Sequence, residues 1–542
     1  MSAWILRVCV LLLAAEGVSA QEHEQAAGAG EKLGEVHFST SCNKAAQKEF
    51  DRAVALLHSF QFSKAIQGFK ATLKEDMTCG IAYWGIALSD WSNPFASGKK
   101  DASQLGAGQA SVELGKKTSA KTERELGYIA AVGMLYSDYE RTPQSVRVLA
   151  YRNAMEGLAA KYPNDSEAEI FYALAIVESE DPADKTYAGR LKAGPILEKL
   201  FEDEPNHPGL AHYIIHTYDV PPLAPRALGA ARRYSEIAPD APHALHMPSH
   251  TFTRTGYWQD SINSNLAAAA SAKRQGQTAE ELHASDYLTY AYLQTGQDEA
   301  ARRVLNSLPE IAARFEPKVV ISGAGGPSAG YFAQAAIPAR YELERGNWMQ
   351  AAQLNPKETP FPYTEAMTWF ARGYGSARLG QAAGAYEAVA ALKQIHERLL
   401  KLDESYWALQ VQIQELEVQA WAQMAEGKKQ EGLKQIESAA LLEDGTEKSA
   451  VTPGPLVPAR ELLAEMLLQV NQPGAALVQF EKTLKKEPGR FRALYGAGYA
   501  AQLSGKAQAS QSYFRELLRF CEHADKPGRT ELQGVEKEIS QK

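Results

Sequence analysis

Four histidines of this 542-residue chain have a spacing that suits a metal site. His212 and His216 form one His-x-x-x-His pair, His246 and His250 form another, and matching members lie 34 residues apart. Residues four apart share one face of a helix, so each pair can offer two imidazole nitrogens to one ion, as zinc sites do. The spacing predicts two equivalent pairs on neighbouring helices that close around one transition metal.

Other polar side chains share these helix faces. With an offset of 40 residues, the segment around His283 matches the segment around His243. We expect the metal to be bound by His212, His216, His246, His250 and Asp286, and we expect Asp219, His243, Arg254, His283 and Tyr290 to orient these ligands or contact a substrate. Imidazole and carboxylate ligands suit zinc, copper or iron, and a carboxylate can also orient a ring by accepting its second N–H. The histidines left over from the two pairs leave open a two-metal site.

Several other functions are disfavoured by the sequence. It has no His-Glu-x-x-His, no Cys-x-x-Cys and no serine or cysteine nucleophile motif. The net charge is −8 and no basic run occurs, so we expect no nucleic-acid partner. After the N-terminus no segment has eighteen uninterrupted apolar residues, so we expect no membrane span. Catalytic residues stay unassigned.

The elements that must position the histidines are helices. The chain is rich in Ala and Leu with helical periodicity and shows no sustained strand-like alternation, which predicts an all-α protein. Near the C-terminus, Ala464 and Gly498 lie 34 residues apart, as do Phe480 and Phe514. This pattern of small, aromatic and proline positions resembles the tetratricopeptide repeat (TPR), a helix–turn–helix unit. The resemblance covers most of residues 45–520 and implies a right-handed α-solenoid.

The resemblance also suggests where the histidines point. In TPR proteins the first helix of each repeat lines a concave groove in which other members grip peptides, so the matching positions here are expected to face the groove. The histidine region looks like that of exported bacterial TPR proteins of unassigned activity. Two functions therefore stay open: a groove site for a metal or small ligand, possibly catalytic, or a metal-free protein- or peptide-binding scaffold of the cell envelope.

The N-terminus predicts export. Residues 1–20 have a positive charge at Arg7, a short apolar core and a small-residue ending at Ala20, as in a cleavable signal peptide. We therefore expect a secreted or periplasmic protein. In an oxidising compartment Cys42 and Cys79 can form a disulfide, but two buried thiols are an equal alternative because the sequence does not give their geometry.

The expected organisation follows the repeats. We expect a signal peptide (1–20), a disordered segment (21–44), N-terminal repeats (45–178) with an irregular insertion (92–123), central repeats with the histidines (179–300), further repeats (301–450), C-terminal repeats (451–525) and a polar tail (526–542). Within the histidine region, Pro248 is expected to kink its helix, because an interior proline removes a backbone hydrogen bond.

Overall fold

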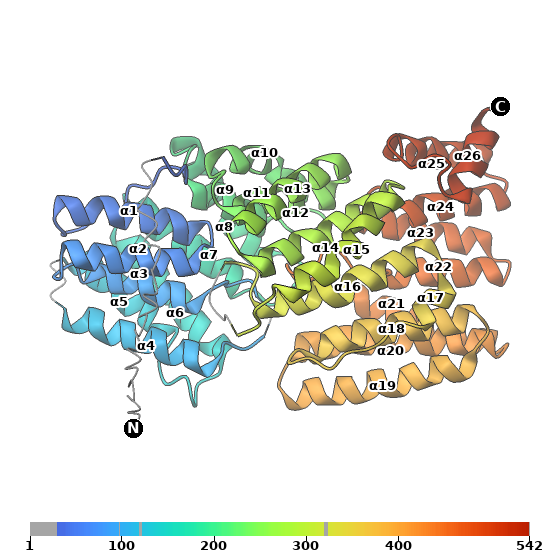
Figure 1. Ribbon diagram of the computed structural model, residues 1–542, viewed down its shortest axis with the longest axis horizontal. Coiled ribbons are helices and arrows are strands. Elements are labelled where there is room, and N and C mark those ends of the chain that lie inside the picture. The colour runs from blue at the N-terminus through green and yellow to red at the C-terminus, as the bar shows by residue number, and fades with distance from the viewer. Residues whose placement is uncertain (1–29, 97, 119–121, 319–322, 541–542) are drawn as a thin grey trace, which may run out of the picture.

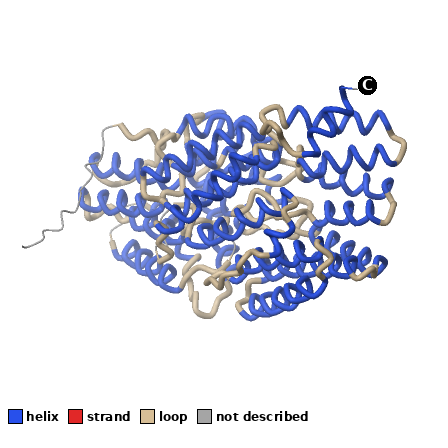
Figure 2. Tube along the Cα trace, turned by 45° about the vertical axis from the view of Figure 1, so that its right-hand side comes forward, coloured by secondary structure: helices blue, strands red, loops and turns tan. Residues whose placement is uncertain are grey.

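The computed structural model describes residues 30–96, 98–118, 122–318 and 323–540, and the expected signal peptide lies outside these ranges. Throughout the described residues the regular structure is helical and no strand occurs (Figures 1 and 2). Helices consecutive along the chain pack against one another, as α1 on α2, α13 on α14 and α24 on α25. The prediction of an all-α solenoid of TPR-like helix pairs is confirmed.

The helices of the first half are α1 (Lys44–His58), α2 (Phe62–Glu75), α3 (Ile81–Trp91), α4 (Ala102–Lys117), α5 (Glu123–Met134), α6 (Gln144–Lys161), α7 (Ser166–Glu178), α8 (Ala188–Asp203), α9 (Pro208–Thr217), the short 3₁₀ helix η1 (Ala224–Ala227), α10 (Leu228–Ile237), α11 (Pro242–His246), α12 (Pro248–Thr255) and α13 (Trp258–Arg274). Those of the second half are α14 (Thr278–Gln294), α15 (Asp298–Ala313), α16 (Pro327–Arg345), α17 (Trp348–Ala352), α18 (Pro362–Arg378), α19 (Ala382–Lys401), α20 (Ser405–Ala425), α21 (Lys429–Asp444), α22 (Ala459–Gln469), α23 (Pro473–Lys486), α24 (Phe491–Leu503), α25 (Ala507–Phe520) and α26 (Thr530–Ser540).

The small and aromatic repeat positions pack as the pattern predicts. Phe480 and Phe514 are almost fully buried between helices. A Cβ atom on Gly496 would come within 2.3 Å of the Phe480 ring, and one on Gly498 within 2.3 Å of the Phe514 ring. Glycine is therefore required where each aromatic ring fills the space between adjacent helices.

The buried apolar side chains form two large cores. One contains residues from Leu33 to Phe252, and the other contains residues from Phe332 to Ala501. Smaller clusters lie between them, including one that extends from Trp258 to Tyr341. The histidine helices lie where the first core ends. The expected boundary between residues 300 and 301 falls inside α15.

The segment expected to be an irregular insertion over 92–123 is largely helical. Asp101 caps α4 by accepting a hydrogen bond from the Ser103 N–H (2.8 Å). The glycines that suggested a loop serve packing instead, since a Cβ on Gly108 would overlap the Tyr136 ring at 2.1 Å. Between α3 and α4, the described residues outside regular helices are 92–96 and 98–101.

The described parts of the two polar terminal segments, 21–44 and 526–542, are also more ordered than their composition indicates. Within the segment 21–44, which we expected to be disordered, residues 30–43 are described and Phe38 is fully buried against the first helices. The Glu35 N–H donates to the Asn206 carbonyl (3.0 Å). In the tail 526–542, Arg529 is buried and paired with Asp298 (2.6 Å), directly before α26. A few buried anchors thus order segments that are polar on average.

Cys42 and Cys79 are joined by a disulfide. The bond ties the residues just before α1 to the residues just before α3. It settles the alternative that the sequence left open.

A further segment, residues 445–458 between α21 and α22, crosses the inner side of the solenoid and is called the inner strap here. Its Lys448 pairs with Asp219 (3.0 Å), and its Ala450 and Thr452 carbonyls accept hydrogen bonds from the Tyr287 hydroxyl (3.2 and 3.1 Å). Arg340 donates to the carbonyl of Gly454 (2.8 Å). The strap therefore joins the C-terminal helices to the histidine helices.

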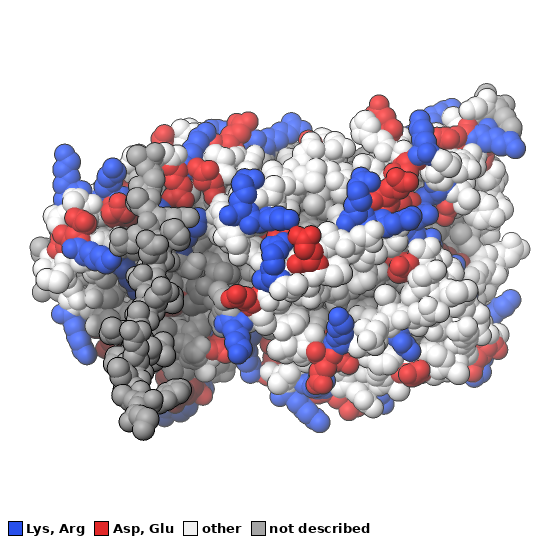
Figure 3. Space-filling model, viewed as in Figure 1, with Lys and Arg blue, Asp and Glu red and all other residues white. Residues whose placement is uncertain are grey.

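Charged side chains of both signs are interspersed over the face in Figure 3, and no broad basic stripe crosses it. Among the described helices, none combines the length and apolar character needed to cross a membrane.

Candidate metal centre

Six buried histidines meet inside the solenoid from four consecutive inner helices. α9 carries His212 and His216, α11 carries His243 and His246, α12 carries His250 and α14 carries His283. The exposed fraction of each of these residues is 6% or less. The repeat spacing thus brings six imidazoles together in a buried region, where polar groups normally need hydrogen-bond partners.

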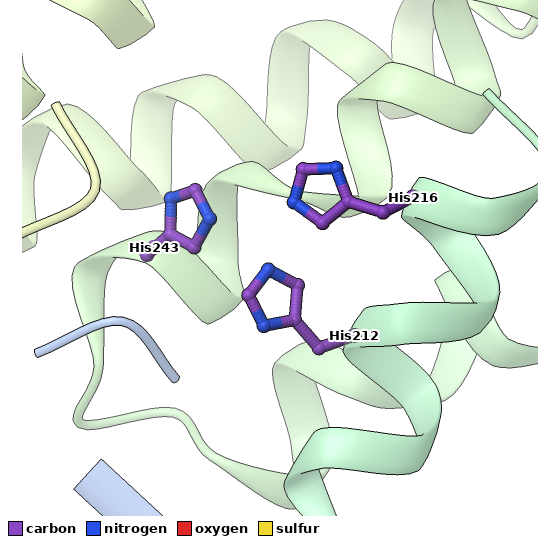
Figure 4. A group of neighbouring side chains, drawn as sticks. All are labelled: His212, His216 and His243. Carbon is purple, nitrogen blue, oxygen red and sulfur yellow. The ribbon is translucent and has the colours of Figure 1, made fainter. Parts of the chain in front are cut away.

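The six side chains form two groups of three. In the upstream triad, His212, His216 and His243, one nitrogen of each ring lies within 4.8 Å of the others. Figure 4 shows the two rings from α9 and the ring from α11 around one common space. In the downstream triad, His246, His250 and His283, the same limit of 4.8 Å holds.

This grouping differs from the expected single site around both His-x-x-x-His pairs. The chain from Pro242 to Thr255 is helical, with Met247 between α11 and α12 in the right-handed helical region (φ −54°, ψ −35°). Along this stretch His243 joins the α9 pair, whereas His246 and His250 join His283 of α14. His243 and His283, which we expected to play supporting roles, are members of the triads.

Hydrogen bonds fix the orientation of three rings. The Nδ1 atom of His212 lies 2.6 Å from the His58 carbonyl, that of His246 lies 2.7 Å from Asn265 Oδ1, and that of His250 lies 3.0 Å from Asp219 Oδ2. Each partner is an oxygen acceptor, so each Nδ1 carries the proton. Asn265 is itself oriented, because its Nδ2 donates to the Ser261 carbonyl (2.8 Å). The Nε2 atoms of these rings therefore carry lone pairs.

Several triad nitrogens lack hydrogen-bond partners. The Nε2 atoms of His212, His216 and His243 are buried without a hydrogen bond, whereas His243 Nδ1 lies 3.8 Å from Glu280 Oε2. In the downstream triad, the Nε2 atoms of His246 and His250 lie 3.1 Å apart. Two nitrogens held by one tetrahedral zinc ion at 2.0–2.1 Å lie about 3.3 Å apart. The spacing fits two ligands of a single cation.

Burial keeps five of these imidazoles neutral: His212, His216, His246, His250 and His283. Desolvation, reinforced by the neighbouring histidines, holds the pKa of His212, His216 and His246 well below the ordinary value. Desolvation also lowers the pKa of His250 to about 4, although Asp219 opposes it, and that of His283 to about 3. Neutral imidazole is the form that binds metals.

The predicted carboxylates have different environments. Asp219 lies beside the downstream triad and accepts hydrogen bonds from His250, Arg254 (3.0 Å) and Lys448 (3.0 Å). It therefore orients His250, and Arg254 orients Asp219. Asp286 instead pairs with Arg340 (2.8 Å) and belongs to neither triad.

Tyr290 also lies apart from the triads. Its hydroxyl donates to Glu487 (3.3 Å), and its ring faces Arg340 and Arg490. Asp286 and Tyr290 thus belong to a buried arginine network next to the histidines.

Sequence reasoning missed several polar residues around the triads. Asn265, Glu280 and Tyr287 contact triad histidines, and Lys448 contacts Asp219. Glu280 and Tyr287 lie three residues before and four after His283, so helix periodicity could have found them. Asn265 lies on α13, and Lys448 lies 229 residues from its partner Asp219; no local pattern connects them to the histidines.

A third group, His58, Glu167 and His207, satisfies its own hydrogen-bonding needs. His58 Nε2 lies 2.9 Å from one Glu167 oxygen, and His207 Nε2 lies 3.1 Å from the other. His207 Nδ1 accepts from the Leu210 N–H (3.3 Å), so its Nε2 must carry the proton given to Glu167. This group is a structural hydrogen-bonded cluster and contrasts with the two triads.

A cavity of about 440 Å³ reaches both triads. Its walls include His216, His243, His250 and His283. Other parts of the lining come from residues 92, 93, 95, 96, 98–101, 317, 324–329 and 331 and from the inner strap. The Phe95 ring stacks on His216 with centroids 4.0 Å apart. Segments far apart in the sequence therefore enclose a space large enough for a small molecule beside the histidines.

No protein-family model and no curated protein matches this chain. Among solved structures, the human IFIT1 dimer with m7Gppp-AAAA is 11% identical, with 89% of this chain and 96% of that chain covered and a TM-score of 0.35. The Cut9–Hcn1 assembly of the APC/C is 13% identical, with 91% and 90% covered and a TM-score of 0.32. The TPR domain of P58(IPK) is 12% identical, with 86% and 99% covered and a TM-score of 0.22. The protein's own helix pairs define its class, an α-solenoid of TPR-like repeats.

Proposed function

We propose that this protein is a metal-binding α-solenoid that holds one transition-metal ion in each histidine triad. The observation that carries the proposal is the arrangement of nitrogen lone pairs. In each triad, three buried imidazoles converge within 4.8 Å, and three of the six rings have Nδ1 held by an oxygen acceptor. This is how metal-binding histidines are usually oriented. An all-imidazole ligand set suits zinc, copper or iron.

The cavity beside the triads supports a reactive role for the metal ions. Three imidazole ligands leave a coordination position for water or substrate, as in catalytic zinc sites. The cavity gives a small molecule access to His216, His243, His250 and His283. The reaction is either metal-assisted hydrolysis or oxidation, depending on the ion.

The protein is proposed to work outside the cytoplasm. The signal-like residues 1–20 support export. The Cys42–Cys79 disulfide fits an oxidising compartment such as the periplasm.

The test is metal stoichiometry. Purified mature protein, equilibrated with zinc, copper(II) or iron(II), is expected to retain about two ions per chain. The variant His212→Ala/His243→Ala should retain only the ion of the downstream triad, and His246→Ala/His283→Ala only that of the upstream triad. His396→Ala changes a half-buried histidine of α19 outside both triads and serves as the control.

Inductively coupled plasma mass spectrometry gives the metal content, and far-ultraviolet circular dichroism verifies that each variant is folded. Full metal content in both double variants would remove the triads from consideration.

A metal-free scaffold that binds a protein or peptide partner is the alternative. The solenoid form favours it, because concave helical arrays present extended binding surfaces. The inner strap, however, already occupies inner helices α14 and α16 through Tyr287 and Arg340. A stable partner recovered with protein that takes up no metal would favour the alternative.

A further inference from the structure

A second cavity, here called the α20 cavity, lies among α18, α20, α23 and the inner strap and has a volume of about 100 Å³. The triad histidines do not line it. One wall is a single face of α20, which presents Trp407, Gln410, Gln414 and Glu417 at intervals of three or four residues.

Polar atoms on this face are buried without partners. Glu417 Oε1, Gln414 Oε1 and Gln410 Nε2 make no hydrogen bond, and the exposed fraction of Glu417 is only 2%. Leaving a buried carboxyl oxygen unsatisfied is costly. Glu417 therefore indicates a ligand with hydrogen-bond donors.

The electrostatics of the wall favour a cation. Burial, together with the nearby Glu443, raises the pKa of Glu417 well above its ordinary value. Glu443 is also buried and accepts a hydrogen bond from the Ala459 N–H (3.0 Å). Glu417 therefore favours its neutral, protonated form, and a positive charge beside it would stabilise the ionised form instead.

Six basic side chains also line the cavity, and three of them pair with carboxylates other than Glu417: Arg340 with Asp286, Arg460 with Asp444, and Lys448 with Asp219. Of the others, Arg254 pairs with Asp219 and Lys486 donates to the Glu443 carbonyl (3.2 Å), and the remaining one is Lys482.

Aromatic rings complete the cavity. The lining includes Phe332, Tyr363, Phe370, Tyr406 and Trp407. Tyr363 and Trp407 are stacked with centroids 3.8 Å apart. Aromatic faces attract organic cations, and cages of such rings recognise ammonium groups.

We propose that the α20 cavity binds a small organic ammonium ion, held by Glu417 and Gln414 against the aromatic wall. The site is separate from the histidine triads and does not depend on their binding metal.

Isothermal titration calorimetry of the full mature protein with ethylammonium chloride and tetramethylammonium chloride, against sodium chloride, tests the proposal. Both ammonium ions should bind the unmodified protein. Glu417→Gln keeps the shape of the side chain but removes the charge, so binding should weaken about tenfold or more, equivalent to about 1.4 kcal/mol. Glu415→Gln, on the same helix but outside the cavity, is the matched control and should bind as the unmodified protein does.

Gln414→Leu replaces a half-buried amide without burying a charge and provides a second measurement if Glu417→Gln does not fold. Binding of ordinary strength in either folded variant would overturn the proposal, as would a failure of both ammonium ions to bind the unmodified protein. Sodium acetate binding in their place would assign the cavity to anions, with Arg254 as the attractor. Ammonium binding that a metal chelator abolishes would assign it to the triads and also overturn the proposal.

Discussion

At the scale of single residues, the two nitrogens of His212, His246 and His250 have different environments. His246 shows the division most clearly: its Nδ1 is fixed by Asn265, and its Nε2 faces His250 at 3.1 Å. The orientation of the triad nitrogens thus depends on residues outside the triads.

Asn265 provides a direct test of this dependence. In Asn265→Leu the His246 ring loses its acceptor, so we expect the metal affinity of the downstream triad to fall about 10- to 100-fold. The upstream triad should keep its affinity. Competition with a chromophoric chelator measures both sites, and Gln259→Leu, on the exposed side of the same helix, is the control. Equal weakening of both triads would indicate a general loss of structure instead.

Glu465 determines part of the response to acid. It pairs with Arg378 (2.6 Å) and Arg492 (2.9 Å). Burial raises its pKa, but the two guanidinium charges outweigh burial and bring the pKa down to about 2. Because the pKa is depressed in the folded state, the stabilisation is fully present above about pH 4.5 and is lost as the pH falls towards about 2.

We therefore expect the unmodified protein to lose about 3 kcal/mol of this contribution over that pH range. Glu465→Gln should lack this part of the pH dependence. Urea unfolding of both proteins at a series of pH values measures the difference. Parallel stability curves for the two proteins would contradict the assignment.

The sequence located the histidines because a repeat copies positions at a constant offset. It could not divide them into two triads, because that division depends on how the rings of α9, α11, α12 and α14 pack side by side. It placed Asp286 among the ligands because Asp286 has the repeat position of His246. In the structure, however, the Asp286 carboxylate pairs with Arg340, which lies 54 residues further along the chain.

At the scale of elements, the helical stretch formed by α11 and α12 supplies histidines to both triads: His243 to the upstream triad, and His246 and His250 to the downstream triad. Within this stretch Pro248 lacks an N–H, so the hydrogen bond to the carbonyl four residues earlier is absent.

We expect Pro248→Ala to separate stability from binding. Alanine restores the missing donor and favours a continuous helix, so the melting temperature should stay the same or rise. The changed direction of His250 should lower the metal affinity of the downstream triad about tenfold. Calorimetric melting and metal titration give the two quantities, with Pro473→Ala at the first residue of α23 as the control. Undiminished metal affinity would show that Pro248 does not determine the direction of the His250 side chain.

Helix periodicity predicted most elements but missed those that carry glycine or begin after a loop-like stretch. In α4 the glycines give Tyr136 room to pack, and in α26 the preceding Arg529 is held by Asp298. These helices are stabilised by tertiary contacts that composition does not reveal.

At the scale of the whole molecule, the inner strap couples the two large cores. Lys448→Met leaves Asp219 with one charged partner fewer in a buried position, so the free energy of unfolding should fall by about 1–3 kcal/mol. Urea unfolding followed by circular dichroism measures the loss. Lys485→Met, an exposed lysine of α23, should have almost no effect. A loss of similar size in both variants would show that the contact between Lys448 and Asp219 contributes nothing specific.

Solenoids built only from neighbouring contacts tolerate the gain or loss of a repeat, since each unit rests on the next. The inner strap removes that freedom here. Its reach from α21 to Asp219 is fixed by the number of repeats in between, so one unit more or fewer would carry Lys448 out of range. Evolutionary change in the number of repeats is therefore restricted between residues 219 and 448.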